Sequence, residues 1–484
     1  MKKNIYTAFF IVVIAFLTAF GYIYKINSTT LNYSLMSLPT VHYSSLRGPA
    51  SISSKVKEAV SSHQARLAVI PQSNNPPIIS PDNPIQPRKS SGQSGDPAWI
   101  NIFSPFNLNK INQPTIPEAL CNDGTQPSYY LKRGFGAGAN RWIIWLEGGG
   151  GCGSDDPTNP TWCGYRKNTY LSTSNGLPSS VGDMQGILTK SDAYNSDFYS
   201  YNQISVHYCS SDFWGGTGVK KVIDSTTQEK WWFSGRKIVE ALVLDLKQKY
   251  NFANATNVIL TGSSAGGAGI VMNADEIKNS IPNADVVTLV DAVNIIPFYR
   301  YFKATNPEPE YIDEPIVFKN IYEWVPMIAN KNCLNSQRKC GINERCIRED
   351  YKCMLPGVAS RYLKMPTFIA ADQLDNSILA MYSLSLCTER NKAEYGPWLN
   401  EFTAQSNAAA KTVSGYFLPR TGDHGLAPTH HWVTPVVENG VNVRLKDVFG
   451  AWYFNRSTSV KKFIQTPSTT LDPHQESSQG LCSQ

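Results

Sequence analysis

The sequence is poor in the patterns that mark nucleic-acid binding, repeat architecture and phosphate binding. Only 17% of its 484 residues are charged and 42% are hydrophobic, which fits a folded domain. The formal net charge of +6 has a local source, because residues 1–112 hold ten Lys and Arg against three Asp and Glu. The rest of the chain is close to neutral, so no basic patch argues for nucleic acid as a partner. No internal repeat is present, and no glycine run continues into the phosphate-binding pattern G-K-[ST].

Cysteine never occurs as C-x-x-C, although ten cysteines are present. An even number without that spacing predicts disulfides, which persist in oxidising compartments. Glycosylation sequons at Asn27, Asn32, Asn254 and Asn455 fit the same location.

The N-terminus begins with Lys2 and Lys3 and continues as an uncharged run over residues 4–24. This run is longer than the apolar part of a usual signal peptide, about 7–15 residues, and approaches the ~20 residues that span a bilayer. We expect residues 1–25 to be an uncleaved signal anchor, with a cleaved signal peptide as the alternative. The two lysines place the body outside the cell or in a lumen, secreted or anchored by a single N-terminal span.

Composition divides the rest of the chain. Residues 26–112 are rich in Ser, Pro and Asn and predict a disordered stalk, because such a segment buries too little apolar surface to fold alone. Residues 113–460 form the expected catalytic domain, and residues 461–484 a polar tail. Strand patterns alternate with helix patterns in the domain, which predicts an α/β fold with a mostly parallel sheet and helices on both faces. The predicted strands are 141–147, 202–208, 258–260, 286–293, 365–375 and 413–424, and the predicted helices are 229–250 and 267–277.

The stretch NVILTGSSAGGAG, residues 257–269, joins a buried-strand pattern to a helix pattern through the motif G-x-S-x-G. Ser264 stands at its centre. A serine on such a tight turn exposes its hydroxyl, and the helix that follows aims amide hydrogens at developing negative charge. The alternative is a turn of small residues without catalytic function. The strand–turn–helix context favours a nucleophile.

A serine nucleophile needs a base and an orienting acid. His424 directly follows the stretch YFLPRTGD and so sits just past a strand end, where a triad histidine belongs, whereas His430 and His431 come a few residues later. The acid should come at the end of a strand between Ser264 and the histidine, and the stretch PTFIAADQLDN offers both Asp372 and Asp375. The spacing alone does not choose between them, and either could instead cap a helix.

An oxyanion hole needs backbone amides that converge on one point. In the run WLEGGGGCG the glycines directly follow the predicted strand 141–147, and they allow such a turn. A plain tight turn is the alternative.

At this point the sequence resembles the Notum and pectin acetylesterase family over residues 121–455. The resemblance rests on the ordered blocks CNDGTQPSYYL, WIIWLEGGG, QGIL, HYCSSDFWGG, LTGSSAGGAG, TFIAADQLD and GAWYFNR. It implies an α/β-hydrolase-like fold and a carboxylic ester hydrolase with Ser264 as nucleophile, Asp375 as acid and His424 as base. It places the oxyanion amides on Gly149, Gly150 and Ala265. It also implies two disulfides, Cys121 with Cys209 and Cys152 with Cys163.

Four cysteines between Cys333 and Cys353 predict a disulfide-rich cap or insertion, with the pairing of Cys333, Cys340, Cys346, Cys353, Cys387 and Cys482 left open. Notum carries Trp-Tyr where this chain has Gly150 and Gly151, which removes apolar wall from a long acyl chain's pocket and favours a small acyl group.

The expected function is therefore removal of acetyl from a polysaccharide, with removal of palmitoleate from a protein as the alternative. A non-catalytic binding module and a peptidase of the same architecture are the further alternatives. The expected substrate is an O-acylated glycan or acylated protein. We expect no metal, no cofactor, no nucleic acid, no membrane contact except through the N-terminal segment, and a monomer.

Overall fold

The computed structural model describes residues 104–300, 311–313, 316–337, 350–382, 395–457 and 459–467. The predicted anchor, residues 1–25, and almost all of the predicted stalk lie outside these ranges, as do Cys340, Cys346, Cys387 and Cys482. None of the helices in the described ranges combines the length and the hydropathy that a membrane-crossing helix requires.

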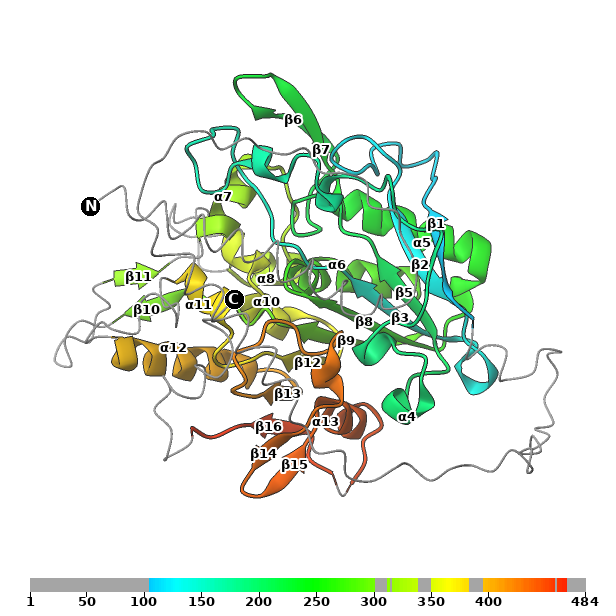
Figure 1. Ribbon diagram of the computed structural model, residues 1–484, viewed down its shortest axis with the longest axis vertical. Helices are drawn as coiled ribbons and strands as arrows, with labels where there is room; N and C mark the ends of the chain where they lie inside the picture. The colour runs from blue at the N-terminus through cyan, green and yellow to red at the C-terminus, as the bar shows by residue number, and fades with distance from the viewer. Residues whose placement is uncertain are drawn as a thin grey trace, which may run out of the picture. The chain divides into compact units, whose positions relative to one another are not determined.

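The elements fall into one large sheet, three small two-stranded sheets and the helices around them (Figure 1). The strands are β1 Phe106–Lys110, β2 Ser128–Lys132, β3 Arg141–Leu146, β4 Ser180–Val181, β5 Asn202–Val206, β6 Val219–Asp224, β7 Glu229–Phe233, β8 Asn257–Ser263, β9 Asp285–Asp291, β10 Phe298–Arg300, β11 Tyr311–Asp313, β12 Thr367–Ala370, β13 Gly415–Leu418, β14 Val436–Glu438, β15 Val441–Val443 and β16 Lys462–Ile464. The α-helices are α4 Asp192–Asn195, α5 Gly235–Tyr250, α6 Ala265–Ser280, α7 Ile316–Trp324, α8 Lys331–Gln337, α10 Pro356–Ala359, α11 Asn376–Met381, α12 Tyr395–Ala410 and α13 Leu445–Tyr453.

The ten-stranded sheet has the order β16-β13-β12-β9-β8-β3-β5-β2-β1-β4. From β16 to β5 neighbouring strands run parallel, and from β5 to β4 the pairs are antiparallel. The prediction of a mostly parallel sheet is confirmed. The carboxyl ends of β3, β8, β9, β12 and β13 consequently meet at one edge of the sheet, which is where sites form in such folds.

The parallel strands are buried on both faces, as continuous apolar runs predict. In β3, Trp142 and Ile144 belong to one apolar cluster, whereas Ile143 belongs to a second. The first cluster includes the apolar sides of α5 and α6, and the second includes that of α13. Helices therefore cover both faces of the sheet.

The folded domain extends beyond the predicted range 113–460 at both ends. Strand β1 lies in the segment assigned to the stalk, and β16 lies in the segment assigned to the tail. Strand β1 alternates polar and apolar residues in the antiparallel part of the sheet, between β2 and the short edge strand β4, and much of it is exposed, so its composition resembles that of the stalk. Strand β16 has only three residues and pairs in parallel with β13.

The predicted helix 229–250 divides into two elements. Its first part is strand β7, which pairs with β6 as an antiparallel hairpin, the one at the top of Figure 1. Helix α5 begins only at Gly235. The pair Trp231 and Trp232 has strand propensity, and the glycine separates it from the helical pattern.

The cysteine-rich segment is an insertion between β9 and β12. A disulfide joins Cys333 on α8 to Cys353 in a short 3-10 turn over Asp350–Met354. The Asn330 side chain before α8 donates to the Val271 carbonyl of α6, 2.8 Å away, which holds the insertion against that helix.

Candidate active site

Ser264 occupies the turn between β8 and α6 in a conformation that few non-glycine residues adopt. Its φ is +56° and its ψ is −122°, and its side chain is largely buried. The backbone around it is tightly packed, because a Cβ on Gly266 would lie 1.9 Å from the Leu146 carbonyl oxygen. Only glycine fits there. Such backbone strain clusters at functional sites, and here it has the form of a nucleophile elbow.

The second serine of the turn is engaged elsewhere. Ser263 Oγ donates a hydrogen bond of 2.5 Å to the Asp291 carboxylate. The same carboxylate accepts the Leu426 amide at 3.1 Å, and the Asp291 carbonyl accepts the Ser264 amide at 3.0 Å. Asp291, at the end of β9, therefore ties the serine turn to the loop that carries His424. Sequence reasoning missed this residue, although its place at the carboxyl end of a parallel strand was visible.

His424 and Asp375 form a buried pair. His424 Nδ1 lies 2.7 Å from Asp375 Oδ2, and the Asp375 side chain is 3% exposed. The carboxylate fixes the proton on Nδ1, so that Nε2 is the nitrogen able to accept a proton. Burial lowers the pKa of His424, but the charge and hydrogen bond of Asp375, with a contribution from Asp291, outweigh burial and leave the pKa raised.

Asp375 combines the two roles that the sequence left as alternatives. Its Oδ1 accepts the amides of Ser377 and Ile378 at 3.0 and 3.1 Å and so caps α11, while Oδ2 holds the histidine. Asp372 instead accepts the backbone amide and the hydroxyl of Thr421, both at 2.6 Å. Burial raises the pKa of Asp372 to about 7, against the effect of these hydrogen bonds. Asp372 thus holds the turn after β13.

The two later histidines lie together on a short 3-10 turn with ring centroids 4.0 Å apart. His431 Nε2 lies 2.8 Å from the half-exposed carboxylate of Asp423. Burial and the charge of His431 lower the pKa of His430, against the attraction of Asp423. Neither has the buried carboxylate partner that His424 has.

The glycine run lies against the serine turn. A Cβ on Gly148 would be 3.1 Å from Ser264 Cβ. Gly149 and Gly150 have φ values of +138° and +65°, and their carbonyls accept hydrogen bonds from Arg166 at 2.7 Å and from Tyr208 at 2.8 Å. In a planar trans peptide the N–H points opposite to the C=O, so the following amides are directed away from these donors.

A buried ion pair supports the base of this run. His207 Nδ1 lies 3.0 Å from Glu147 Oε2, and its Nε2 lies 2.9 Å from the carbonyls of Tyr170 and Thr173. Both nitrogens face acceptors, an arrangement that favours the protonated ring. Burial lowers the pKa of His207, but the hydrogen bond and charge of Glu147 act in the opposite direction, and the pKa is raised overall. Glu147 directly precedes Gly148, so this pair fixes the point where β3 enters the run.

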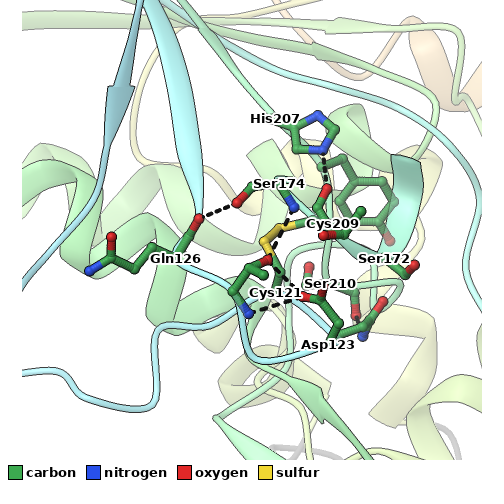
Figure 2. Close-up of a disulfide and its surroundings, with 12 residues drawn as sticks. Cys121, Asp123, Gln126, Ser172, Ser174, His207, Cys209 and Ser210 are labelled. Atoms are coloured by element: carbon green, nitrogen blue, oxygen red, sulfur yellow. Dashed lines mark hydrogen bonds between the residues drawn. A yellow bond between two sulfur atoms is a disulfide. The ribbon is translucent and has the colours of Figure 1, made fainter. Parts of the chain in front are cut away.

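Two disulfides border the same region. The structure joins Cys121 to Cys209 and Cys152 to Cys163, the two pairs implied by the family resemblance. Cys209 lies three residues past β5, and Cys152 directly follows the last glycine of the run. Figure 2 shows the first disulfide with His207 and Ser210 beside it.

Comparisons with known proteins identify the family and the fold. The family model described as Pectinacetylesterase matches residues 103–472. The palmitoleoyl-protein carboxylesterase NOTUM of Schmidtea mediterranea is 28% identical over 77% of this chain and 68% of its own length. Pectin acetylesterase 11 of Arabidopsis thaliana is 26% identical over 70% of this chain and 85% of its own.

A solved structure of the Wnt deacylase Notum from Drosophila aligns with a TM-score of 0.60 at 20% identity and covers 75% of this chain and 97% of that one. This likeness shows the fold, which confirms the predicted α/β-hydrolase-like architecture. The family model matches most of the sequence, and this match shows that the chain belongs to the pectinacetylesterase family.

Proposed function

We propose that this protein is a serine carboxylesterase that removes O-linked acyl groups from an extracellular substrate, with acetylated polysaccharide as the substrate class. The observation that carries the proposal is that Asp291 accepts hydrogen bonds from both the Ser264 turn and the loop that carries His424. The strained elbow, the buried His424–Asp375 pair and the glycine run then lie at one edge of the sheet. Relatives named as pectin acetylesterases and carboxylesterases support the reaction class.

The chemistry follows from the roles of these groups. Ser264 Oγ attacks the ester carbonyl while His424 Nε2 takes its proton. Asp375 keeps the imidazole in the right tautomer and stabilises the imidazolium. The amides of Gly149, Gly150 and Ala265 hold the oxyanion, and the substrate alcohol leaves with the proton from His424. Water then attacks the acyl-enzyme by the same route, which releases the carboxylic acid and restores Ser264.

The glycine run favours a small acyl group. A Cβ on Gly151 would lie 2.6 Å from Ile321 Cδ1, so a side chain of α7 already occupies that space. Ile321 is fully buried, and Phe318 of the same helix stacks on Phe213 with ring centroids 4.2 Å apart. This packing supports acetyl as the natural acyl group. A palmitoleoyl-protein substrate is the alternative, since a relative with that printed activity covers most of the chain.

The location outside the cell rests on the three disulfides and on the relatives. An N-terminal anchor over residues 1–25 and a stalk after it remain part of the proposal, as does a monomeric state.

The test is a series of p-nitrophenyl esters with acyl chains from acetyl to palmitoyl, together with release of acetate from acetylated pectin. A fluorophosphonate probe followed by peptide mass spectrometry identifies the nucleophile. We expect hydrolysis of the short esters and a covalent adduct on Ser264. Absence of both would contradict an enzyme and favour a binding module. Cleavage of amides as fast as of esters would favour a peptidase.

A further inference from the structure

Arg166 is a buried cation. Its residue exposure is 2%, and it forms no ion pair with a carboxylate in the described part of the chain. Arg236, which is buried to a similar degree, pairs with Glu276 at 2.8 Å and Glu240 at 3.4 Å. A buried charge is costly unless it is paired and hydrogen-bonded. The cost of burying this guanidinium suggests that Arg166 has a function at its position in the fold.

The contacts of Arg166 lead directly to the glycine run. Nη1 donates to the Gly149 carbonyl at 2.7 Å, and Nε donates to Ser211 Oγ at 2.8 Å. Nη2 is buried and makes no hydrogen bond to any residue that the structure describes. The guanidinium carbon lies 5.9 Å from the ring centres of Tyr165 and Tyr208, whose faces attract a cation. Tyr208 in turn donates to the Gly150 carbonyl, so the run is held at two successive carbonyls.

A chain of buried hydrogen bonds fixes the arginine itself. The Ser211 hydroxyl, which accepts the hydrogen bond from Arg166 Nε, donates to Asn122 Oδ1 at 2.6 Å. The Asn122 side chain donates to the carbonyls of Ser210 and Trp232 at 3.0 and 2.6 Å. Asn122 directly follows Cys121, which is bonded to Cys209, and Figure 2 shows this disulfide with Ser210 beside it. The arginine is thus connected through two side chains to a covalent crosslink.

The second disulfide acts on the same element. Arg166 ends a 3-10 turn over Cys163–Arg166, and Cys163 is bonded to Cys152, directly after the run. Glycine in the run has high conformational freedom, with positive φ at Gly149 and Gly150. An oxyanion hole requires the opposite, since its donors must be in place before the charge develops. Arg166 and the two disulfides supply the rigidity that glycine lacks.

We propose that Arg166 is the positioning residue of the oxyanion hole: by holding the Gly149 carbonyl it directs the Gly150 amide toward the acyl oxygen, and its unpaired charge stabilises the negative charge that forms there. The peptide between these glycines is planar and trans, so fixing one end fixes the other. The arginine is too deeply buried to bind a substrate carboxylate directly. This inference rests on the proposed function.

The experiment compares Arg166→Met and Arg166→Lys with Arg236→Lys, a buried arginine outside the site. Each kcat is divided by the fraction of Ser264 that reacts with a fluorophosphonate probe, so that misfolded protein is not counted. Loss of one oxyanion donor typically costs about 10²–10³ in kcat. We expect Arg166→Met to lose about 100-fold in kcat with KM within about threefold, Arg166→Lys to retain part of the activity, and Arg236→Lys to keep kcat per reactive site.

A second pair of measurements covers the case in which Arg166→Met does not fold. Ser211→Ala removes the acceptor that orients Nε, and should lower kcat by about tenfold without changing KM. Where Arg166 variants do fold, Arg166→Ala should in addition recover activity on addition of methylguanidinium, with saturation. A merely structural arginine would give neither rescue nor a selective loss of kcat.

Failure of the proposed function and failure of the inference about Arg166 give different results. If the wild-type protein hydrolyses no ester and Ser264 does not react with the probe, the proposed function is overturned. If the wild-type protein is active while Arg166→Met, or Ser211→Ala where the first variant does not fold, keeps full kcat per reactive site, the inference about Arg166 is overturned alone.

Discussion

The backbone carbonyl of Asp291 accepts a hydrogen bond from the amide of Ser264, 3.0 Å away. The carboxylate of the same residue accepts the hydroxyl of Ser263 and the amide of Leu426. Burial raises the pKa of Asp291 to about 6, although these hydrogen bonds and the charge of His424 act in the opposite direction. One side chain therefore sets both the position of the base loop and part of its electrostatics.

Replacing Asp291 with Asn should move the acid limb of the kcat/KM profile to lower pH. The Asp291 carboxylate helps to raise the pKa of His424, and the base acts only when it is neutral. Without that charge the pKa of His424 falls, so the neutral form persists to lower pH. The measurement is kcat/KM against pH. Asp423→Asn, which removes the carboxylate beside His431, is the control and should leave the limb in place. An unchanged limb in Asp291→Asn would contradict this electrostatic role.

Adjacent serines give a matched test of the nucleophile. Ser264→Ala should lose about six powers of ten in kcat, because loss of a triad nucleophile has that cost in serine hydrolases. Ser263→Ala removes only the hydrogen bond to Asp291 and should stay within about tenfold of the wild type. Thermal unfolding checks that both variants are folded. Near wild-type turnover by Ser264→Ala would exclude it as the nucleophile.

The sequence predicted elements well where the pattern was local. The apolar runs of β3, β8 and β9 and the glycines around Ser264 carry their own strand and turn signals, and the structure has them in place. The roles of Asp291 and Arg166 could not be predicted in this way, because they arise from tertiary contacts with Leu426 and Gly149, which are 135 and 17 residues away along the chain. Strands β1 and β16 were missed because short, half-solvated strands resemble loops in composition.

The roles of the three histidines closest after β13, His424, His430 and His431, can be separated by mutation. His424→Ala should lower kcat by several powers of ten, because only this ring bonds a buried carboxylate. His430→Ala and His431→Ala should keep most of the activity, since His431 bonds the half-exposed Asp423 and His430 lies beside it. The measurement is kcat on a short ester for all three variants. If His431→Ala lost activity while His424→Ala kept it, the assignment of His424 as the base would be wrong.

The crosslinks should differ in their contribution to stability. The Cys121–Cys209 bond closes a separation of 88 residues and the Cys152–Cys163 bond one of 11. Chain entropy assigns about 4.6 and about 2.8 kcal/mol to such loops. Paired serine replacements should therefore lower the free energy of unfolding more at the first crosslink, as measured by denaturant titration. Mass spectrometry of the unreduced protein should find all ten cysteines oxidised, and mostly free thiols would contradict an oxidising compartment.

Acyl length is the property that separates the two activities named among the relatives. Each methylene buried in a pocket contributes about 0.8 kcal/mol, so a pocket for a long chain would favour the long ester by several powers of ten. In this protein Ile321 of α7 occupies the space beside Gly151, and Phe213 and Phe318 stack beside it. We therefore expect a higher kcat/KM for acetyl or butyryl esters than for palmitoleoyl esters, measured below the micelle concentration of the long ester.

Removing that side chain should lengthen the preferred acyl chain. Ile321→Ala frees space for two or three methylenes, which corresponds to about 10- to 50-fold in kcat/KM for hexanoyl relative to acetyl esters. Ile277→Ala, which removes the same atoms from a buried position near the far end of α6, should lower stability and leave the chain-length profile unchanged. A wild-type preference for octanoyl or longer chains would refute the small pocket. An unchanged profile in Ile321→Ala would show that another side chain limits acyl length, because the space beside Gly151 would then not be part of the acyl pocket.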